Sequence, residues 1–78
     1  MFIQAEVGSK IGIGYSVAEC DENYFQVKGL KNGVVTVVVI EEGQIKEYPL
    51  KIGNSFRAGR ITFLFCGIST YGPCFEKW

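Results

Sequence analysis

The sequence predicts an all-β protein, a small twisted antiparallel sheet or barrel-like subunit of five to six strands. β-branched and aromatic residues dominate the chain, and no window repeats apolar residues with the period of a helix. Clusters of turn residues separate short apolar or alternating runs. Because 78 residues leave room for one core, we expect a single β domain over residues 1–70. Residues 71–78 are too broken by Gly and Pro for a helix and predict a C-terminal tail, either loose or docked on a neighbouring subunit.

The first strand is expected at residues 2–7, where side chains alternate between an apolar and a more polar face. Such alternation is typical of a half-buried strand. After Gly8 the chain reads as extended over residues 10–20, and its glycines suit a bulge or a sharp coil of the sheet. Residues 21–23 read as a turn.

A hairpin is predicted where two apolar strands, residues 24–30 and 34–40, flank the dipeptide Asn32-Gly33. Asn-Gly between alternating or apolar runs is the strongest short-range hairpin signal, because both residues tolerate the positive φ angles of a tight turn.

Two more strands follow the hairpin. Residues 41–44 read as a turn, and residues 45–52 return as a strand. Pro49 has no N–H to donate to a ladder, so this strand is expected at a sheet edge or to be bulged there. Residues 60–68 form the last strong strand.

The composition predicts self-association. The chain is 47% hydrophobic and 14% aromatic, whereas a domain of this size buries only about 60% of its unfolded surface. Strands 34–40 and 61–68 are apolar on both faces and therefore need a layer on each side, which a second subunit would supply. We expect an intertwined homo-oligomer, with Phe75 and Trp78 as anchors on a neighbour. No apolar run approaches the roughly 18 residues that span a membrane, so no membrane association is expected.

The cysteines predict neither a metal site nor a disulfide framework. There is no His, and the three cysteines show no Cys-x-x-Cys spacing, so we expect no metal and no cofactor. Nothing resembles a secretory leader, which predicts a cytoplasmic protein. Cys66 lies in an apolar run and is expected to be a small buried thiol. For Cys74 the sequence leaves both a paired and a free thiol open.

Catalysis is not expected. The chain has no His and no Ser or Cys with a base at a recognisable spacing. The acidic pairs at residues 21–22 and 41–42 fall in predicted turns, where solvated charges are ordinary. The motif "GIGYSV" lacks the third glycine of a dinucleotide-binding fingerprint, and "GNSFRAGR" has neither the spacing nor the Lys-Ser/Thr of a P-loop. The sequence therefore predicts a non-enzymatic protein.

One phrase occurs twice in the chain, as "VGSKIGIG" at residues 7–14 and "IGNSFRAG" at residues 52–59. The first glycines of the two copies, Gly8 and Gly53, are 45 residues apart. A glycine followed by small or polar residues and then by an apolar, glycine-ended run is typical of a tight turn that leads into a coiled strand. The repeat therefore predicts a structural element that the fold uses twice.

The segments "MFIQAEVGSKIGIG" and "IGNSFRAGRITFLFCGI", residues 1–14 and 52–68, resemble the carbon storage regulator family. That family opens with Met-Leu-Ile, a basic pair and Val-Gly-Glu-Ser-Ile-x-Ile-Gly. The resemblance implies a small twisted β-sheet subunit in an interlocked dimer that binds RNA. Ala5-Glu6 replaces the basic pair, and the family's later His-Arg-Glu-Glu segment and C-terminal helix have no counterpart. The RNA-contacting residues therefore do not carry over to this chain.

The best polar cluster lies in "KIGNSFRAGR", which holds both arginines of a chain whose net charge is zero. Turn amides, hydroxyls and forked guanidinium groups suit a phosphate or carboxylate, and the aromatic rings of Tyr48 and Phe56 could stack on a base. The candidate ligand-binding residues are Tyr48, Lys51, Asn54, Ser55, Arg57 and Arg60. The alternative is that the arginines are solvated charges that pair with Glu41, Glu42 or Glu47.

Three functions remain open. The first is a homo-oligomer that holds a small anionic ligand at a subunit interface, such as a phage-type protein that sequesters or senses a nucleotide signal. The second is an RNA-binding post-transcriptional regulator, as the family resemblance implies. The third is a structural or protein-interaction module, such as a piece of a virion, which uses apolar strands and its C-terminal segment. Zero net charge weakens the case for long nucleic acids, which basic proteins usually bind.

Overall fold

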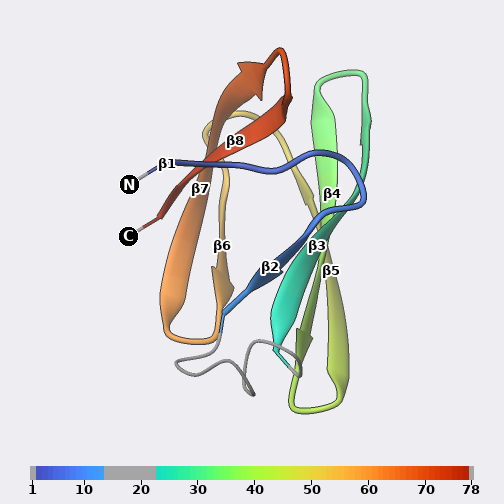
Figure 1. The fold of residues 1–78 in the computed structure, drawn as a ribbon, viewed down its shortest axis with the longest axis vertical. Helices are drawn as coiled ribbons and strands as arrows, with labels where there is room; N and C mark the ends of the chain where they lie inside the picture. Colours follow the sequence, from blue (N-terminus) through green and yellow to red (C-terminus); the bar gives the residue numbers. More distant parts are fainter. Residues whose placement is uncertain (1, 14–22, 78) are drawn as a thin grey trace.

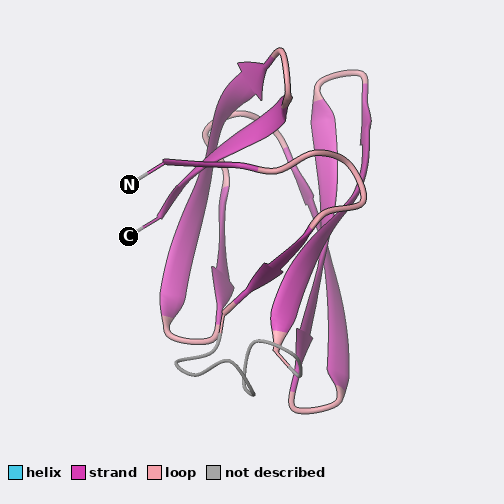
Figure 2. Cartoon of the chain, in the orientation of Figure 1, coloured by secondary structure: helices cyan, strands magenta, loops and turns pink. Residues whose placement is uncertain are grey.

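The computed structural model describes residues 2–13 and 23–77. Over these residues the chain forms eight β-strands and no helix (Figure 2). The strands make two four-stranded sheets that face each other as a sandwich (Figure 1), and every strand pairing is antiparallel. The predicted all-β class is confirmed. The strands number eight rather than five or six, and the sheets stack as two layers instead of closing into a barrel.

Both sheets draw on strands from distant parts of the chain. Sheet A contains, in spatial order, β1 (Phe2–Gln4), β8 (Gly72–Lys77), β7 (Ile61–Ser69) and β6 (Ser55–Ala58). Sheet B contains, in spatial order, β2 (Lys10–Gly12), β3 (Tyr24–Lys31), β4 (Val34–Glu41) and β5 (Gln44–Leu50). The first strand thus pairs with the last, with Ile3 opposite Phe75, and the two chain ends lie close together (Figure 1).

The hairpin predicted at Asn32-Gly33 joins β3 to β4. The φ angles of these residues are 54° and 76°, and both are positive as a type I′ turn requires. This turn twists the same way as the flanking strands, so the long β3–β4 ladder continues directly from it. The hairpin prediction is therefore confirmed.

The position of Pro49 at a sheet edge is also confirmed, because β5 is the last strand of sheet B. A two-residue turn joins β4 to β5, so hydrogen-bonded and non-hydrogen-bonded pairs alternate from Glu41–Gln44 onward. In this alternation the backbone nitrogens of Ile45, Glu47 and Pro49 face away from β4. Pro49 therefore costs the ladder no hydrogen bond, and it removes a donor from the free edge, which discourages pairing with another strand.

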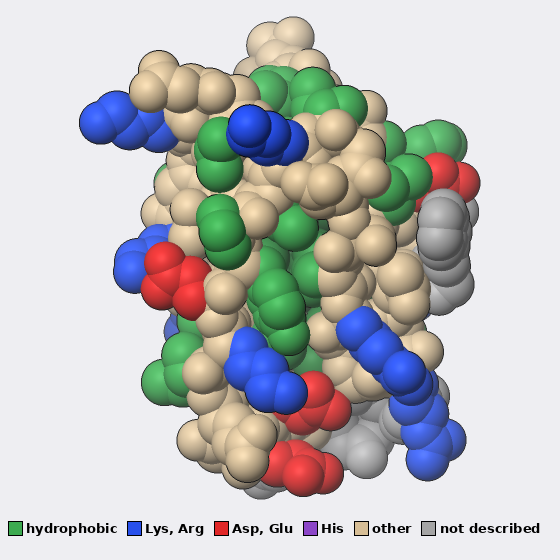
Figure 3. Space-filling view, turned by 180° about the vertical axis from the view of Figure 1, so that it is seen from behind, with side chains coloured by type: hydrophobic (Ala, Val, Ile, Leu, Met, Phe, Trp, Pro, Cys, Tyr) green, Lys and Arg blue, Asp and Glu red, His purple; other side chains and the backbone are tan. Residues whose placement is uncertain are grey.

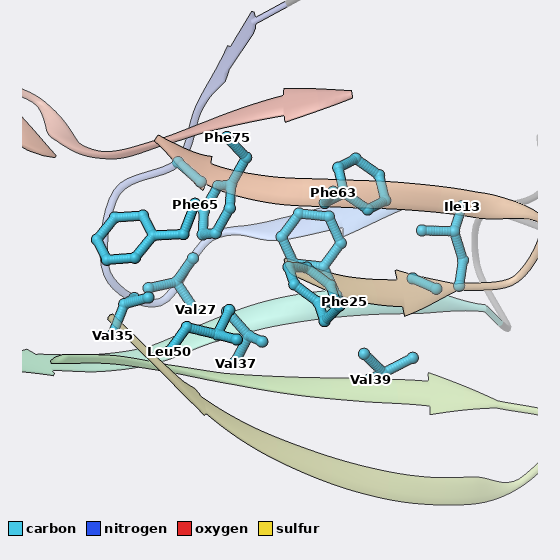
Figure 4. Packing of buried hydrophobic residues seen from close by; sticks show 13 residues of the cluster. Ile13, Phe25, Val27, Val35, Val37, Val39, Leu50, Phe63, Phe65 and Phe75 are labelled. Atoms are coloured by element: carbon cyan, nitrogen blue, oxygen red, sulfur yellow. The ribbon is translucent and has the colours of Figure 1, made fainter. Parts of the chain in front are cut away.

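The core lies between the sheets and is built around aromatic rings (Figure 4). Phe25 of sheet B inserts among rings of sheet A, with centroids 4.8 Å from Phe63, 5.1 Å from Phe56 and 5.6 Å from Phe75. Fully burying a phenylalanine stabilises a fold by about 1.5–3 kcal/mol, so these contacts hold the two layers together.

The strands that are apolar on both faces find one of their two covering layers inside the chain. In β4, Val37 and Val39 are buried against sheet A, while Val38 and Ile40 on the outer face are half-buried. The strand β7 shows the same alternation. The inner layer therefore comes from the second sheet of the same chain, and association with a second copy remains a prediction.

The predicted tail at residues 71–78 is corrected for the part that the structure describes. Gly72–Lys77 form β8, which lies between β1 and β7. Pro73 and Phe75 are fully buried inside the same chain, so Phe75 does not anchor on a neighbour. The sequence hides this strand because Gly and Pro punctuate it, although its apolar side chains recur at every second residue. Trp78 lies outside the described residues, as do residues 14–22 of the predicted second strand and turn.

The two sheets are structural copies of each other. The β3–β4 and β7–β8 hairpins have the same register 38 residues apart, with Val27 opposite Val37 in one and Phe65 opposite Phe75 in the other. Each hairpin contains a β-bulge at the same place, directly after these pairs. The chain therefore consists of a first half, β1–β4, and a second half, β5–β8.

The repeated phrase connects the sheets in both halves. Ser9 donates to the Glu6 carbonyl and Asn54 to the Lys51 carbonyl, each at 2.9 Å, and the glycine inside each turn has a φ of 94° or 97°. Glycine in the third position of such a turn is typical of type II. The first turn carries the chain from sheet A to sheet B, and the second carries it back.

The two halves are therefore interlocked. The first strand of each half, β1 or β5, lies in the sheet formed by the other three strands of the opposite half. The offset between equivalent residues is 45 in the repeated phrase, as between Gly8 and Gly53, and 38 in the hairpins, as between Gly29 and Gly67. The first half thus has a longer connection between its second and third strands.

Candidate functional site

The sandwich has two open sides, where edge strands of the two sheets run past each other. We call them the β5/β6 side and the β1/β2 side, after the strands that border them. The candidate residues border the first: Tyr48 on β5, Lys51 and Asn54 in the β5–β6 turn, Ser55 and Arg57 on β6, and Arg60 in the β6–β7 turn. Figure 3 looks at the molecule from the back, opposite β1 and β2.

The middle of the β5/β6 side is a stack of two aromatic rings. The rings of Tyr48 and Phe56 lie 6.0 Å apart with an interplanar angle of 28°. Phe56 is only 4% exposed, because core rings cover the rest of it. The prediction that Phe56 stacks on a base is therefore wrong, since its ring is already packed. Tyr48 is half-buried and keeps part of its side chain at the surface.

One end of this side is the β5–β6 turn. The side-chain oxygen of Asn54 accepts a hydrogen bond from the Lys51 backbone N–H at 2.9 Å. Asn54 therefore contributes first to the shape of the turn, as asparagine often does. Ser55 follows on the outer face of β6, and the side chains of all three residues are exposed.

The two arginines lie toward the other end of β6. Arg57 is exposed on the outer face, and its Nε donates to the Gly59 carbonyl at 3.2 Å. Arg60 is exposed in the turn that leads to β7. Because a strand rises about 3.3 Å per residue, Asn54 and Ala58 are about 13 Å apart. The structure thus separates the predicted site into two clusters, one at each end of β6.

A carboxylate joins the two sheets beside the second cluster. The Oε2 atom of Glu41, at the end of β4, accepts a hydrogen bond from the Gly59 backbone N–H at 3.3 Å. Next to it is an open hollow of about 210 Å³ against the β4–β5 hairpin, lined by Val39, Glu41, Glu42, Gln44 and Lys46. Lys46 lies opposite buried Val39 and therefore shares its inward face.

Sequence reasoning missed Lys46 as part of this side. The available signal was the strand alternation, which places Lys46 on the same face as Tyr48 and Leu50. Glu47, which was considered as a partner for the arginines, instead pairs with Lys28 at 3.5 Å on the outer face of sheet B.

The equivalent residues on the β1/β2 side have different chemistry. In the repeat, Glu6 is equivalent to Lys51, Gly12 is equivalent to Arg57, and Ile3 is equivalent to Tyr48.

The cation on β2, Lys10, projects on the outer face of sheet B, with its Nζ atom 5.0 Å from the centre of the Tyr24 ring. Four cationic residues, Lys46, Lys51, Arg57 and Arg60, border the β5/β6 side, whereas Lys10 is the cationic residue among those described on the β1/β2 side. Figure 3 shows Lys and Arg side chains on both flanks of a strip of hydrophobic side chains on that face, with Asp or Glu side chains at its lower end.

Comparison with known proteins found no match: no family model, no curated protein and no solved structure is similar to this chain. Within residues 2–13 and 23–77, no helix has the length and apolar character needed to cross a membrane.

Proposed function

We propose that the protein is a non-enzymatic binding protein that holds a small anionic ligand of the nucleotide class on its β5/β6 side. The observation that supports this is the difference between two equivalent places in one fold. The backbone of the repeat is the same on both sides, yet Lys51 and Arg57 stand where the other side has Glu6 and Gly12.

The side-chain chemistry suits phosphate groups. Arginine presents a planar fork of donors that matches phosphate oxygens, and lysine adds a compact positive charge. Because Lys51 lies in the turn before β6 and Arg57 lies near the far end of that extended strand, a ligand that reaches both must be extended. This favours a nucleotide with several phosphates over a single phosphate ion. Tyr48 lies between the clusters and offers an aromatic surface on which a base can stack.

The same proposal includes a second copy of the chain. The β5/β6 side is open, so charges along it are screened by water. A second copy facing it across a two-fold axis would present the same cations again and would exclude water from the ligand. Ligand binding and dimer formation should therefore strengthen each other.

Titration calorimetry with a nucleoside triphosphate, the corresponding nucleoside and inorganic phosphate tests the proposal. The triphosphate should bind, and the two fragments should bind far more weakly, because each reaches only part of the side. Arg57→Ala should weaken triphosphate binding about tenfold, in line with the loss of a charged hydrogen bond of about 1.5 kcal/mol.

The matched control is Lys10→Ala, which removes a cation from the β1/β2 side and should leave triphosphate affinity unchanged. If Arg57→Ala and Lys10→Ala lost the same amount of triphosphate affinity, the ligand would be held by non-specific charge attraction. That result would contradict the proposed site. Sedimentation with and without the triphosphate tests the second copy, and a monomer under both conditions would contradict the shared cavity.

A second candidate is RNA binding, and the interlocking of the two halves favours it. The resemblance to carbon storage regulators implies an interlocked pair of subunits, and here one chain contains two interlocked halves. The position equivalent to Glu6, which replaces one of that family's basic residues, is Lys51 in the second half. The affinity for single-stranded RNA should then fall steeply as the salt concentration rises. The slope of the logarithm of the binding constant against the logarithm of the salt concentration should be about −0.7 for each phosphate contacted. Saturable triphosphate binding together with no RNA binding at low salt would decide for the first candidate.

A further inference from the structure

Two cysteines of sheet A meet on its outer face. The β7–β8 ladder pairs Phe65 with Phe75 and next pairs Gly67 with Cys74, so Cys66 is the extra residue of the bulge. Phe65 and Phe75 are fully buried in the core. Since side chains alternate between faces, Cys66 and Cys74 both project from the opposite face, on neighbouring strands.

The two thiols are close and accessible. The Cys66 Sγ atom donates to the Cys74 carbonyl at 3.2 Å, and both residues are half-buried and free of any disulfide. The expectation that Cys66 is a buried thiol is therefore wrong, because it lies on the outer face of the sheet rather than in the core. In a β-bulge two residues of one strand oppose one residue of its partner, so Cys66 and Gly67 both face Cys74, and the two thiols lie on neighbouring strands as a cross-strand disulfide needs.

The fold does not require cysteine at these positions. The first half has the same bulge, and there the equivalent residues are Lys28 and Thr36. What the two bulges share is the glycine after the extra residue, Gly29 or Gly67. The same backbone is thus built without thiols, so the pair at Cys66 and Cys74 is an addition to one half.

We propose that Cys66 and Cys74 form a dithiol site that reacts with small disulfides, such as oxidised glutathione, and closes into a disulfide across β7 and β8. This site lies on sheet A and is independent of the ligand proposed on the β5/β6 side.

The reaction balances in two exchange steps. A thiolate of the pair attacks oxidised glutathione, which forms a mixed disulfide and releases one glutathione thiolate. The second thiol loses its proton and attacks the protein sulfur of the mixed disulfide, which forms the bond between Cys66 and Cys74 and releases the second glutathione. The two cysteines together lose two electrons and two protons, and the oxidised glutathione is reduced to two molecules of glutathione.

The surroundings of Cys74 set the direction of the pH dependence. Burial raises the pKa of the Cys74 thiol, and the hydrogen bond and charge of Cys66 raise it further. Gln4 lies opposite Cys74 on β1 and carries no charge, and Glu76 is the next residue of β8 on the same face. Because the thiolate is the reacting form, closure should be slow at neutral pH and faster as the pH rises.

Peptide mapping tests the proposal in the full chain with Cys20→Ser, so that the two thiols of interest are the only ones. The protein is incubated with oxidised glutathione, quenched in acid, alkylated and cut with trypsin, which cleaves after Arg60 and Lys77. Both cysteines then lie in the single peptide 61–77. We expect this peptide to be two hydrogens lighter than its reduced form and to resist alkylation.

Single variants separate a pair from two independent thiols. In Cys66→Ser and in Cys74→Ser the remaining cysteine should accumulate a persistent glutathione adduct, whereas the parent should show that adduct only briefly. The proposal is overturned if the parent peptide instead carries two stable glutathione groups, two alkylated thiols after full incubation, or a link between two chains. Far-UV circular dichroism of each variant confirms that the sheets are intact.

Discussion

The two open sides of the sandwich have nearly the same backbone and different chemistry. Each is bordered by the first two strands of one half, joined by a type II turn at Gly8 or Gly53. The buried inward positions are apolar on both sides, whereas the exposed positions differ, as with Glu6 and Lys51. The difference teaches that turns, bulges and inward side chains specify this fold, while the exposed positions are free to carry function.

The largest expected effect concerns the core, where the halves differ in size of side chain. Phe75→Ala should lower the free energy of unfolding by about 3–5 kcal/mol, because a buried ring leaves a large cavity. The equivalent change in the first half, Val37→Ala, removes two carbons and should cost about 2 kcal/mol. Urea denaturation of both variants measures the comparison, and equal costs would mean that the two hairpins do not pack as equivalents.

A smaller loss is expected at the close approach of β8 to the segment after β1. Gly72 has a φ of 128°, and a Cβ atom there would lie 2.8 Å from the Ala5 carbonyl oxygen. Gly72→Ala should therefore destabilise the fold by about 2–3 kcal/mol through backbone strain and displacement of Ala5. Gly67→Ala is the control, since its Cβ meets nothing within 4 Å and its φ is not positive. Thermal unfolding measures the loss of stability in both variants. Equal losses would contradict the close approach of Gly72 to Ala5.

The repeated turn provides a test of equivalence between the halves. Gly8→Ala and Gly53→Ala both force alanine into a positive φ, 94° or 97°, with no atom within 4 Å of the new Cβ. Each should cost about 1–2 kcal/mol, and the two costs should agree within measurement error. Chemical denaturation measures both losses. A large difference between them would show that the two turns that connect the sheets contribute unequally to stability.

A charge exchange should change binding with little effect on stability. Lys51→Glu gives the β5/β6 side the residue found at the equivalent place on the other side, and it should weaken triphosphate binding at least tenfold. Since Lys51 is exposed, the free energy of unfolding should stay within about 0.5 kcal/mol of the parent. The converse change, Glu6→Lys, should leave triphosphate affinity near that of the parent. A strong gain in triphosphate affinity in Glu6→Lys would contradict the proposal, because the ligand would then bind on the β1/β2 side.

The smallest expected effect is on the rate of disulfide closure when the dithiol is moved to the other half. Lys28→Cys with Thr36→Cys, in a chain whose native cysteines are serine, places two thiols on the equivalent bulge. If the bulge geometry brings the thiols together, this pair should close with oxidised glutathione at a rate within about tenfold of the native pair. Peptide mapping that finds only glutathione adducts would show that the two bulges differ.

Local signals in the sequence predicted the parts of the fold that depend on neighbouring residues. Asn32-Gly33 specifies a hairpin because both residues accept positive φ, and Pro49 belongs at an edge because it lacks a donor. The strand β8 was missed because its pattern is short and punctuated by Gly and Pro. Its place became clear only from the partners of Phe75 in β1 and β7.

The sequence predicted most of the residues of the candidate site, but it did not predict how they are arranged in space. The sequence places Lys51 and Arg57 close together along the chain, but Lys51 lies in the turn before β6 and Arg57 near the far end of this extended strand. Lys46 joins the same side through strand alternation, and Phe56 leaves the set because its ring is buried in the core. Whether a side chain faces core or solvent depends on which sheet covers the strand, and this is a tertiary property.

The sequence by itself determined the all-β class, the main hairpin, the edge position of Pro49 and the existence of a repeated turn, because each depends on the backbone preferences of a few adjacent residues. The tertiary structure decided that the repeat builds two interlocked halves, that β1 pairs with β8, and that Cys66 and Cys74 meet across a bulge. These features join residues far apart in the chain, and their contacts become favourable only when both sheets bury their apolar faces against each other.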